Sequence, residues 1–310
     1  MTQPSEAAEQ PPLVVKVGGA RAVDPAGVVA DVAHYTATGR QVVVVHGGSS
    51  AVDDTLEALG EEPEYVETPA GVSGRFTDDE TIETFEMVLP GKLNTELVSD
   101  LRAVGVDAIG LSGVDGGLVT GPRKSAVRIV EDGKKKIRRG DRAGKPVAMN
   151  TGLLETLLSD GYIPTVCPPM LADDGTVANA DADRVAALLA AKLGGELVLL
   201  TDVSGVYADP DDESTLIESA TTPGGMGELE DAADGFMARK VHATREALEG
   251  GAVGVTIGDA GLRKPLVAAL TGHGTSIDPA AVGAKTDGGV ESLQPESDVL
   301  GITASGGDVG

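Results

Sequence analysis

The amino-acid sequence predicts an α/β protein with a mainly parallel sheet that helices cover on both faces. Short valine-rich segments, such as 13–17 and 42–45, have the composition of buried strands. Segments with a helical spacing of apolar residues follow most of these strands, beginning with 24–38. Because a helix between two strands carries the chain back along the sheet, this alternation favours parallel strands with both faces buried.

Composition limits the class of protein and its partners. A chain of 310 residues can bury one large core or two modest ones. Its 49 acidic residues outnumber 24 basic residues and give a net charge of −25, which argues against nucleic acid as a partner. The single cysteine, Cys167, excludes an intramolecular disulfide and suits a reducing compartment, so we expect a cytoplasmic protein. The predicted strands are too short to cross a bilayer, and no membrane partner is expected.

The pattern of strands and helices fills the first half of the chain, 13–172. Residues 1–12 are polar without apolar periodicity, and we expect them to be disordered. Strands are expected at 13–17, 41–46, 107–111 and 163–167. Helices are expected at 24–38, 50–59, 93–104 and 151–159, and from a capping box at 77–80 to Leu89.

A basic β-hairpin interrupts this pattern. The segments 125–130 and 134–139 flank Glu131-Asp132-Gly133, a strong hairpin signal. Residues 123–145 hold ten of the 24 basic residues and three of the 49 acidic ones. The lysines of a solvated hairpin could merely protect an edge strand from pairing. Since the rest of the chain uses acids for solubility, we interpret the hairpin as a docking or anion-binding surface.

A second alternating unit follows, at 173–278. Helices are expected at 181–193 and 237–249, with a short one near 264–270, and strands at 196–201 and 253–257. Beyond 278 the apolar periodicity is lost among Gly, Asp, Ser and Pro, so 279–310 is expected to be a flexible acidic tail.

Two glycine pairs follow buried strands. Lys16 lies in the first strand, just before Gly18 and Gly19, and Gly47 and Gly48 follow the second strand. A lysine in a buried strand is costly unless its ammonium group reaches an anion. Glycines let backbone N–H groups approach that anion closely, and a helix N-terminus after the second pair adds to the field. Each pair alone is typical of a tight turn, but the two together with Lys16 favour phosphoryl transfer.

Further polar residues lie at element ends. Asp181 caps the helix that begins there, while Asp183 in its first turn is better placed to orient a lysine. Asp202 directly follows a buried strand, at the carboxyl end of that strand, and ligands bind at such ends in open α/β sheets. Lys240 lies near a helix start, which alone is ordinary. His46 is interpreted as a structural hydrogen-bonding group; no Cys/His cluster has metal-ligand spacing, and no metal site is expected.

Six motifs occur in order along the chain, at 15–19, 46–48, 74–78, 179–183, 201–206 and 237–240. Together they resemble the amino-acid kinase superfamily, and within it the acetylglutamate kinase branch most closely. Gly113-Val-Asp-Gly-Gly117 followed by the basic hairpin is similar to a narrower group. Its members phosphorylate glutamate or 2-aminoadipate that is held on a small acidic amino-group carrier protein of the LysW type.

The resemblance implies a three-layer αβα sandwich with an open, mainly parallel central sheet, from which the hairpin would protrude. It implies that 13–172 binds the acceptor and forms a homodimer, and that 173–278 binds ATP with Mg²⁺ held mainly by the ATP phosphates. The reaction would give an acyl phosphate in arginine or lysine biosynthesis. The sequence departs from many relatives at Ser49, where they have a third glycine.

The resemblance also assigns roles by motif. The catalytic residues would be Lys16, Lys240 and Asp183. The phosphate-binding residues would be Gly18, Gly19, Gly47 and Gly48. The acceptor-binding residues would be Gly47, Gly48, Arg75 and Asn179. The ATP-binding residues would be Thr201, Asp202, Gly205, Tyr207, Met237 and Lys240. The carrier-docking residues would be Arg123, Lys124, Arg128, Lys134, Lys135, Lys136, Arg138 and Arg139.

Alternatives to this function stay open. The chain could be an N-acetylglutamate kinase acting on a free acetylated substrate or, less well supported, a non-catalytic module that senses an amino acid. Glutamate and 2-aminoadipate differ by one methylene group, which is worth only about 1–3 kcal/mol of discrimination. The sequence therefore does not separate the two acceptors.

Overall fold

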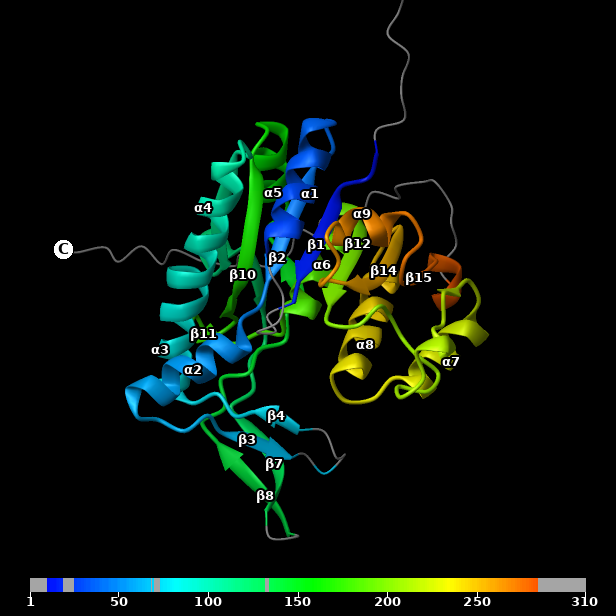
Figure 1. Cartoon of the computed structure of the whole chain (residues 1–310). Coiled ribbons are helices and arrows are strands. Elements are labelled where there is room, and N and C mark those ends of the chain that lie inside the picture. Colours follow the sequence, from blue (N-terminus) through cyan, green and yellow to red (C-terminus); the bar gives the residue numbers. More distant parts are fainter. Residues whose placement is uncertain (1–9, 19–24, 68, 70–72, 132–133, 284–310) are drawn as a thin grey trace, which may run out of the picture.

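A mainly parallel sheet of eleven strands forms the centre of the computed structural model, which describes residues 10–18, 25–67, 69, 73–131 and 134–283 (Figure 1). The order of its main path is β13-β15-β14-β12-β1-β2-β10-β6-β9, and β5 and β11 also pair with β10. Pairing is parallel except for β14–β15, β6–β9 and β10–β11. The strands are β1 (Leu13–Val17), β2 (Val42–His46), β5 (Ala108–Gly113), β6 (Val119–Gly121), β9 (Ala148–Met149), β10 (Ile163–Ala172), β11 (Val177–Ala178), β12 (Glu196–Thr201), β13 (Ser219–Ala220), β14 (Gly254–Asp259) and β15 (Thr275–Ile277).

Helices cover both faces of this sheet. The described α-helices are α1 (Pro25–Ala37), α2 (Ser49–Leu59), α3 (Asp79–Glu86), α4 (Thr95–Ala103), α5 (Thr151–Ser159), α6 (Ala182–Leu193), α7 (Pro223–Ala232), α8 (Gly235–Glu249) and α9 (Pro265–Leu270). Side chains of β1 alternate between two cores: Leu13 and Val15 pack with α1, α4 and α9, and Val14 packs with α5, α6 and α8. This alternation of a pleated strand confirms the predicted three-layer αβα sandwich.

The expected elements are present, with ends within two residues of the predictions in most cases. Two ends differ. The strand predicted at 163–167 continues as β10 to Ala172. The helix predicted to reach Leu89 ends at Glu86 and passes into a wide π-helical segment, η1 (Met87–Asn94). Pro90 lies inside η1, and because proline lacks an N–H group it cannot make the regular α-helical hydrogen bond.

Local details correct other expectations. The cap of α3 is Asp78, whose side chain accepts a hydrogen bond from the backbone of Thr81. The pattern also missed the short hairpin of β3 (Tyr65–Glu67) and β4 (Ser73–Arg75), and helix α7. Residues Pro279–Val282 form a 3₁₀-helix, η4, so the ordered chain runs past the predicted start of the tail. Residues 284–310 and 1–9 lie outside the described residues.

The basic hairpin is confirmed as a two-stranded sheet of its own, β7 (Ala126–Glu131) with β8 (Lys134–Arg139). It lies with β3 and β4 beyond the end of the main sheet (Figure 1). No helix in the described part of the chain is long and apolar enough to cross a membrane.

Candidate active site

Two lysines and one aspartate meet at the carboxyl end of the central strands. Lys16 comes from β1, Asp183 from the first turn of α6 and Lys240 from α8. The Lys16 ammonium lies 2.7 Å from Asp183 Oδ1, and the Lys240 ammonium lies 2.8 Å from Oδ2. Their side chains are only 8%, 8% and 11% exposed, in the order Lys16, Asp183, Lys240. The structure thus brings together the three predicted catalytic residues.

This cluster carries more positive than negative charge. Burial alone would raise the pKa of Asp183, but Lys16 and then Lys240 outweigh burial and lower that pKa to about 2. Burial lowers the pKa of Lys16, and Asp183 partly opposes this. Two ammonium groups with one carboxylate leave the buried cluster with an excess of positive charge, which Asp181 opposes only through a smaller interaction with Lys16. Because an isolated buried charge is costly, the site is suited to an anion such as a phosphate.

Of the four predicted glycines, Gly18 directly follows β1, Gly47 and Gly48 lie between β2 and α2, and Gly19 lies outside the described residues. A Cβ atom at Gly18 would lie 3.0 Å from the Leu200 carbonyl oxygen. A Cβ at Gly48 would lie 2.3 Å from Leu93 Cδ1 and 2.6 Å from Leu89 Cδ2, whereas at Gly47 the nearest atom would be 3.5 Å away. Gly48 directly precedes α2 and is extended in φ. A Cβ at this position would therefore require the leucine side chains of η1 to shift.

Arg75, the predicted ligand of the acceptor carboxylate, has partners that the sequence pattern missed. Its Nη2 lies 2.5 Å from Asp53 Oδ1 and donates to the Tyr65 hydroxyl (2.8 Å) and to Ser49. Its guanidinium also lies over the rings of Tyr65 and Phe85. Arg75 Nε and Nη1 are buried without a hydrogen-bond partner. These two unused donors leave Arg75 able to bind a carboxylate.

Asn179 lies in a different set of contacts. Its side-chain amide donates to Thr77 Oγ1 (3.3 Å), and Thr77 is fully buried. Its backbone is paired with the segment that follows the basic hairpin, through Arg142 and Gly144. Thr77 is therefore a partner of a predicted acceptor-binding residue that no spacing in the sequence indicated.

The predicted ATP-binding residues lie beyond the ends of β12 and near the start of α8. Lys16 pairs in register with Leu199, so Thr201 and Asp202 follow at the same edge of the sheet. The Thr201 hydroxyl donates to the Asp202 carboxylate at 3.0 Å. The described contacts of the other three are structural: Gly205 packs tightly on Thr275, Tyr207 bridges to Leu216 and Met237 packs on the core.

Two further residues, His46 and Cys167, are buried. His46 is buried at the end of β2, its Nδ1 lies 2.8 Å from the Gly47 carbonyl oxygen, and burial lowers its pKa. Cys167 is fully buried among the apolar side chains of α2, α3 and η1, and burial raises its pKa to about 12. Among the described residues, no group of three or more His, Cys, Asp or Glu could hold a metal ion.

The hairpin has two faces of different character, because cross-strand partners point to the same side. The inner face includes Ile129, which is buried, and Arg138, which pairs with Glu64 and lies 4.2 Å from the centre of the Phe76 ring. On this face Lys136 pairs with Glu131. The outer face includes Ile137, 68% exposed. Its cations, which are exposed and have no ion pair with a described residue, are Arg128, Lys135 and Arg139.

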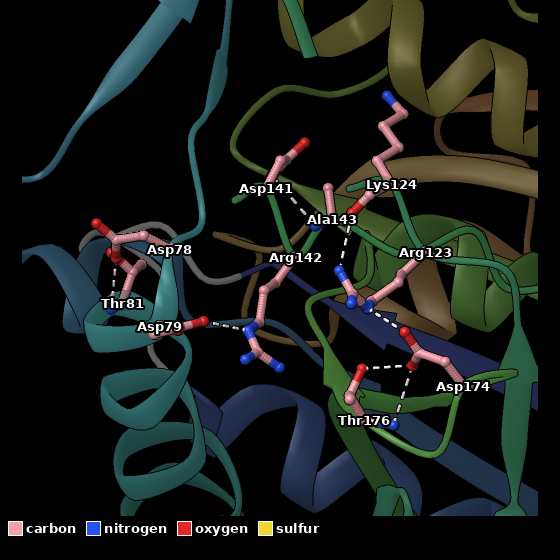
Figure 2. A network of polar contacts seen from close by, with 10 residues as sticks. All are labelled: Asp78, Asp79, Thr81, Arg123, Lys124, Asp141, Arg142, Ala143, Asp174 and Thr176. Carbon is pink, nitrogen blue, oxygen red and sulfur yellow. Dashed lines mark hydrogen bonds and ion pairs between the residues drawn. The ribbon is translucent and has the colours of Figure 1, made fainter. Parts of the chain in front are cut away.

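The remaining predicted docking residues lie at the base and tip of the hairpin. Arg123 Nε pairs with Asp174 at 2.7 Å and Arg123 Nη1 donates to the Lys124 carbonyl oxygen (Figure 2). Lys124 and Lys134 are exposed. The eight predicted docking residues therefore divide into anchored and outward-facing cations. This division depends on the strand register and could not be read from composition.

Comparisons with known proteins agree with this geometry. Residues 11–259 match the model of the amino acid kinase family. The chain is 45% identical over 266 residues to a [LysW]-aminoadipate kinase of Deinococcus radiodurans, covering 86% of this chain and 91% of that protein. It is 41% identical over 271 residues to a [LysW]-aminoadipate kinase of Thermus thermophilus, covering 86% and 99%. It is also 41% identical over 244 residues to an acetylglutamate kinase of Methanopyrus kandleri, covering 77% and 91%.

Solved structures share the fold. N-acetylglutamate synthase from Neisseria gonorrhoeae superposes with a TM-score of 0.67 and 25% identity, covering 87% of this chain and 60% of that chain. Carbamate kinase from Giardia lamblia, bound to AMP-PNP, superposes with a TM-score of 0.61 and 16% identity, covering 87% and 98%. The second likeness concerns the fold alone.

We expect Asp183→Asn to lower the free energy of unfolding by about 3–5 kcal/mol at pH 7, because it leaves buried lysines without their counter-charge. The folded-state pKa of about 2 lies below the reference value of 3.8, so the stabilisation by this carboxylate is complete above pH 4. It is lost as the pH falls from about 4 through 2, and the difference between the two proteins should shrink there. Urea unfolding at pH 7 and pH 3 measures both values.

The matched control is Asp181→Asn, two residues earlier. Asp181 caps α6 by accepting from the N–H groups of Asp183 and Arg184, and asparagine caps helices equally well. A change of less than about 1 kcal/mol is expected for this control. Equal destabilisation by the two substitutions would contradict the assigned role of Asp183.

We expect Gly48→Ala to reduce turnover at least tenfold, because the new methyl group would displace the loop that precedes α2 or the leucines of η1. In the double variant Gly48→Ala/Leu93→Ala the closest clashing side chain is removed, so part of the activity should return. Steady-state kinetics of the single and double variants test this. Gly227→Ala in α7 is the control, since its Cβ would meet nothing within 4 Å. A lack of rescue by Leu93→Ala would refute the packing explanation.

Proposed function

Because this chain belongs to the amino acid kinase family, we propose that it transfers the γ-phosphoryl group of ATP to a side-chain carboxylate of 2-aminoadipate or glutamate. We further propose that the acceptor amino acid is held by its amino group on an acidic carrier protein of the LysW type. The observation that carries the proposal is the buried cluster of Lys16, Asp183 and Lys240, with its excess positive charge. The identity to [LysW]-aminoadipate kinases over most of the chain supports the carrier-bound acceptor.

The chemistry follows from charge. When bound, MgATP supplies the phosphoryl group, and its magnesium offsets phosphate charge. The acceptor carboxylate has a reference pKa near ~4.3, so it is ionised at neutral pH and needs no general base. The barrier is the approach of two anions. Lys16 and Lys240 would stabilise the charge that spreads over the phosphoryl oxygens, and Asp183 would hold the two ammonium groups in place.

The acceptor site would be formed by Arg75, Asn179 and the glycines that precede α2. Arg75 is held rigidly by Asp53 and Tyr65 while two of its nitrogen atoms lack partners. A rigid guanidinium with unused donors is suited to the α-carboxylate of an amino acid. Asn179 would bind the amide through which the amino acid is attached.

We also propose that the enzyme is a homodimer formed by the first half of the chain. Strand β5 pairs only with β10 among the described strands, so its other edge is open. Met87 and Val104, on the neighbouring η1 and at the end of α4, are about half exposed at 55% and 51%. An open edge beside exposed apolar side chains is typical of a subunit contact. Light scattering that returns the mass of a monomer would refute it.

We expect Lys16→Ala and Lys240→Ala each to lower kcat by about 10²–10³, the usual loss when one donor to developing negative charge is removed. The fold should be kept, because each change leaves Asp183 with one remaining lysine. Coupled assays of ADP release measure kcat, and circular dichroism checks that each variant is folded. Near-normal turnover in either variant would reject the assigned roles.

A titration with ATP separates the enzyme from its non-catalytic alternative. An amino-acid-sensing module would bind no ATP, whereas the proposed kinase binds it through the cluster. Calorimetric titration of ATP into the wild-type protein and into the Lys16→Ala and Lys240→Ala variants needs no acceptor. Binding that is weakened in the variants supports the kinase, and no binding to the wild-type protein supports the sensing module.

For carrier docking we expect the outer face of the hairpin to matter most. The double variant Arg128→Glu/Lys135→Glu should raise KM for the carrier-bound acceptor about tenfold, since each exposed contact pair contributes up to about 1 kcal/mol. KM for ATP should not change. Steady-state kinetics with LysW-bound 2-aminoadipate and with free N-acetylglutamate measure the effect.

The control Arg102→Glu/Lys192→Glu reverses the same charges at the ends of α4 and α6 and should leave KM unchanged. Brisk turnover of free N-acetylglutamate, with no effect of the hairpin variant, would instead favour acetylglutamate kinase activity.

A further inference from the structure

The chain that leaves the basic hairpin, residues 141–144, runs directly into the acceptor site. The Arg142 N–H donates to the Thr77 carbonyl oxygen at 2.7 Å, and the Arg142 carbonyl oxygen accepts from the Asn179 N–H at 2.9 Å. The Gly144 N–H then donates to the Asn179 carbonyl oxygen at 2.6 Å. Thr77 and Asn179 also bind each other through their side chains. The segment is therefore inserted between Asn179 of the proposed acceptor site and its partner Thr77, and it is bonded to both.

Asp141 fixes the shape of this segment from inside. It is 3% exposed, and its Oδ1 accepts from the Ala143 N–H at 3.1 Å (Figure 2). Burial raises its pKa, and the backbone N–H groups of Ala143 and Thr77, with the charge of Lys124, act in the opposite direction. It forms no ion pair with any residue that the structure describes. A buried carboxylate held mainly by backbone N–H groups is costly, and here it holds a tight bend between β8 and Asn179.

Both ends of the hairpin are tied to the body of the protein. At the entry, Arg123 pairs with Asp174, and Asp174 also binds Thr176 (Figure 2). At the exit, Arg142 Nε pairs with Asp79 Oδ1 of α3 at 2.5 Å (Figure 2). The Lys124 N–H donates to the Ala143 carbonyl oxygen at 2.8 Å and joins the two ends. A displacement of the hairpin would thus be transmitted to Thr77 and Asn179 through short, contiguous hydrogen bonds.

We propose that residues 141–144 couple docking of the carrier on the hairpin to the alignment of Asn179, and of its partner Thr77, at the acceptor site, with Asp141 as the positioning residue. This inference rests on the proposed function, in which the acceptor arrives on an acidic protein. Its consequence is that the docked carrier acts on kcat as well as on KM, since displacement of an acceptor by about 1 Å can cost about 10² in rate. Contiguous hydrogen-bonded elements of this kind can carry coupling between two sites.

Hydrogen–deuterium exchange of the full chain, with and without LysW that carries no amino acid, tests the coupling. In the wild-type protein we expect slower exchange over 126–139 and also at the amides of Arg142, Gly144 and Asn179, by at least fivefold. Slower exchange over the hairpin alone would overturn the coupling and leave docking intact. No change at the hairpin would overturn the coupling together with the docking on which it rests.

Variants at Asp141 distinguish two causes of slower exchange at Arg142, Gly144 and Asn179: coupling through the segment, and direct shielding of these amides by the bound carrier. In Asp141→Ala the hairpin should still be protected, while protection at Arg142, Gly144 and Asn179 is lost and kcat with LysW-bound 2-aminoadipate falls about tenfold at unchanged KM. Asp141→Asn keeps an oxygen that can accept from the Ala143 N–H, so it should retain at least a third of the wild-type kcat. If the alanine variant does not fold, the asparagine variant still tests the proposal. Asp160→Ala, an exposed acid at the end of α5, is the control. Full protection and full kcat in Asp141→Ala would overturn the proposal.

Discussion

The pairing of two buried lysines with one aspartate is the constraint on which the rest of the structure depends. Lys16, Asp183 and Lys240 come from three elements that are distant in sequence, and each brings its charge into a site with little exposure to solvent. Removing these charges from water is costly, so the surrounding elements must hold them within contact distance. The parallel register of β1 with β12 and β2, and the position of α6 over β1, keep that arrangement in place.

The proposed acceptor site follows a similar principle with different chemistry. Asp53 and Tyr65 hold the guanidinium of Arg75, and Thr77 holds the amide of Asn179, so each polar group that faces the site is positioned by a neighbour outside it. The side chains of Leu89 and Leu93 in η1 pack against Gly48. Since η1 also borders the open edge strand β5, the proposed subunit contact and the glycine loop share one packed element.

The hairpin carries two kinds of cation that its sequence alone does not distinguish. Composition does not separate the ten basic residues of 123–145, yet strand register divides those of β7 and β8 between opposite faces. Arg138 and Arg123 are neutralised by carboxylates of the body and hold the hairpin in position, while Arg128, Lys135 and Arg139 remain exposed around Ile137. In a chain of net charge −25, exposed cations that form no ion pair with a described residue give the hairpin a local positive charge, which an acidic protein could recognise.

The sequence by itself determined the layered α/β fold, most element ends and the candidates Lys16 and Asp183, because strand and helix periodicity and the cost of a buried lysine are local properties. Lys240 became a candidate only through the resemblance of its motif to the family. It could not determine the π-helical turn at Pro90, the small hairpin at Tyr65 or the partners Asp53 and Thr77. Nor could it decide which hairpin cations are anchored. These features arise from contacts between residues separated by many positions. Only the tertiary structure decides them, because it sets which side chains share a face and which buried polar groups find a partner.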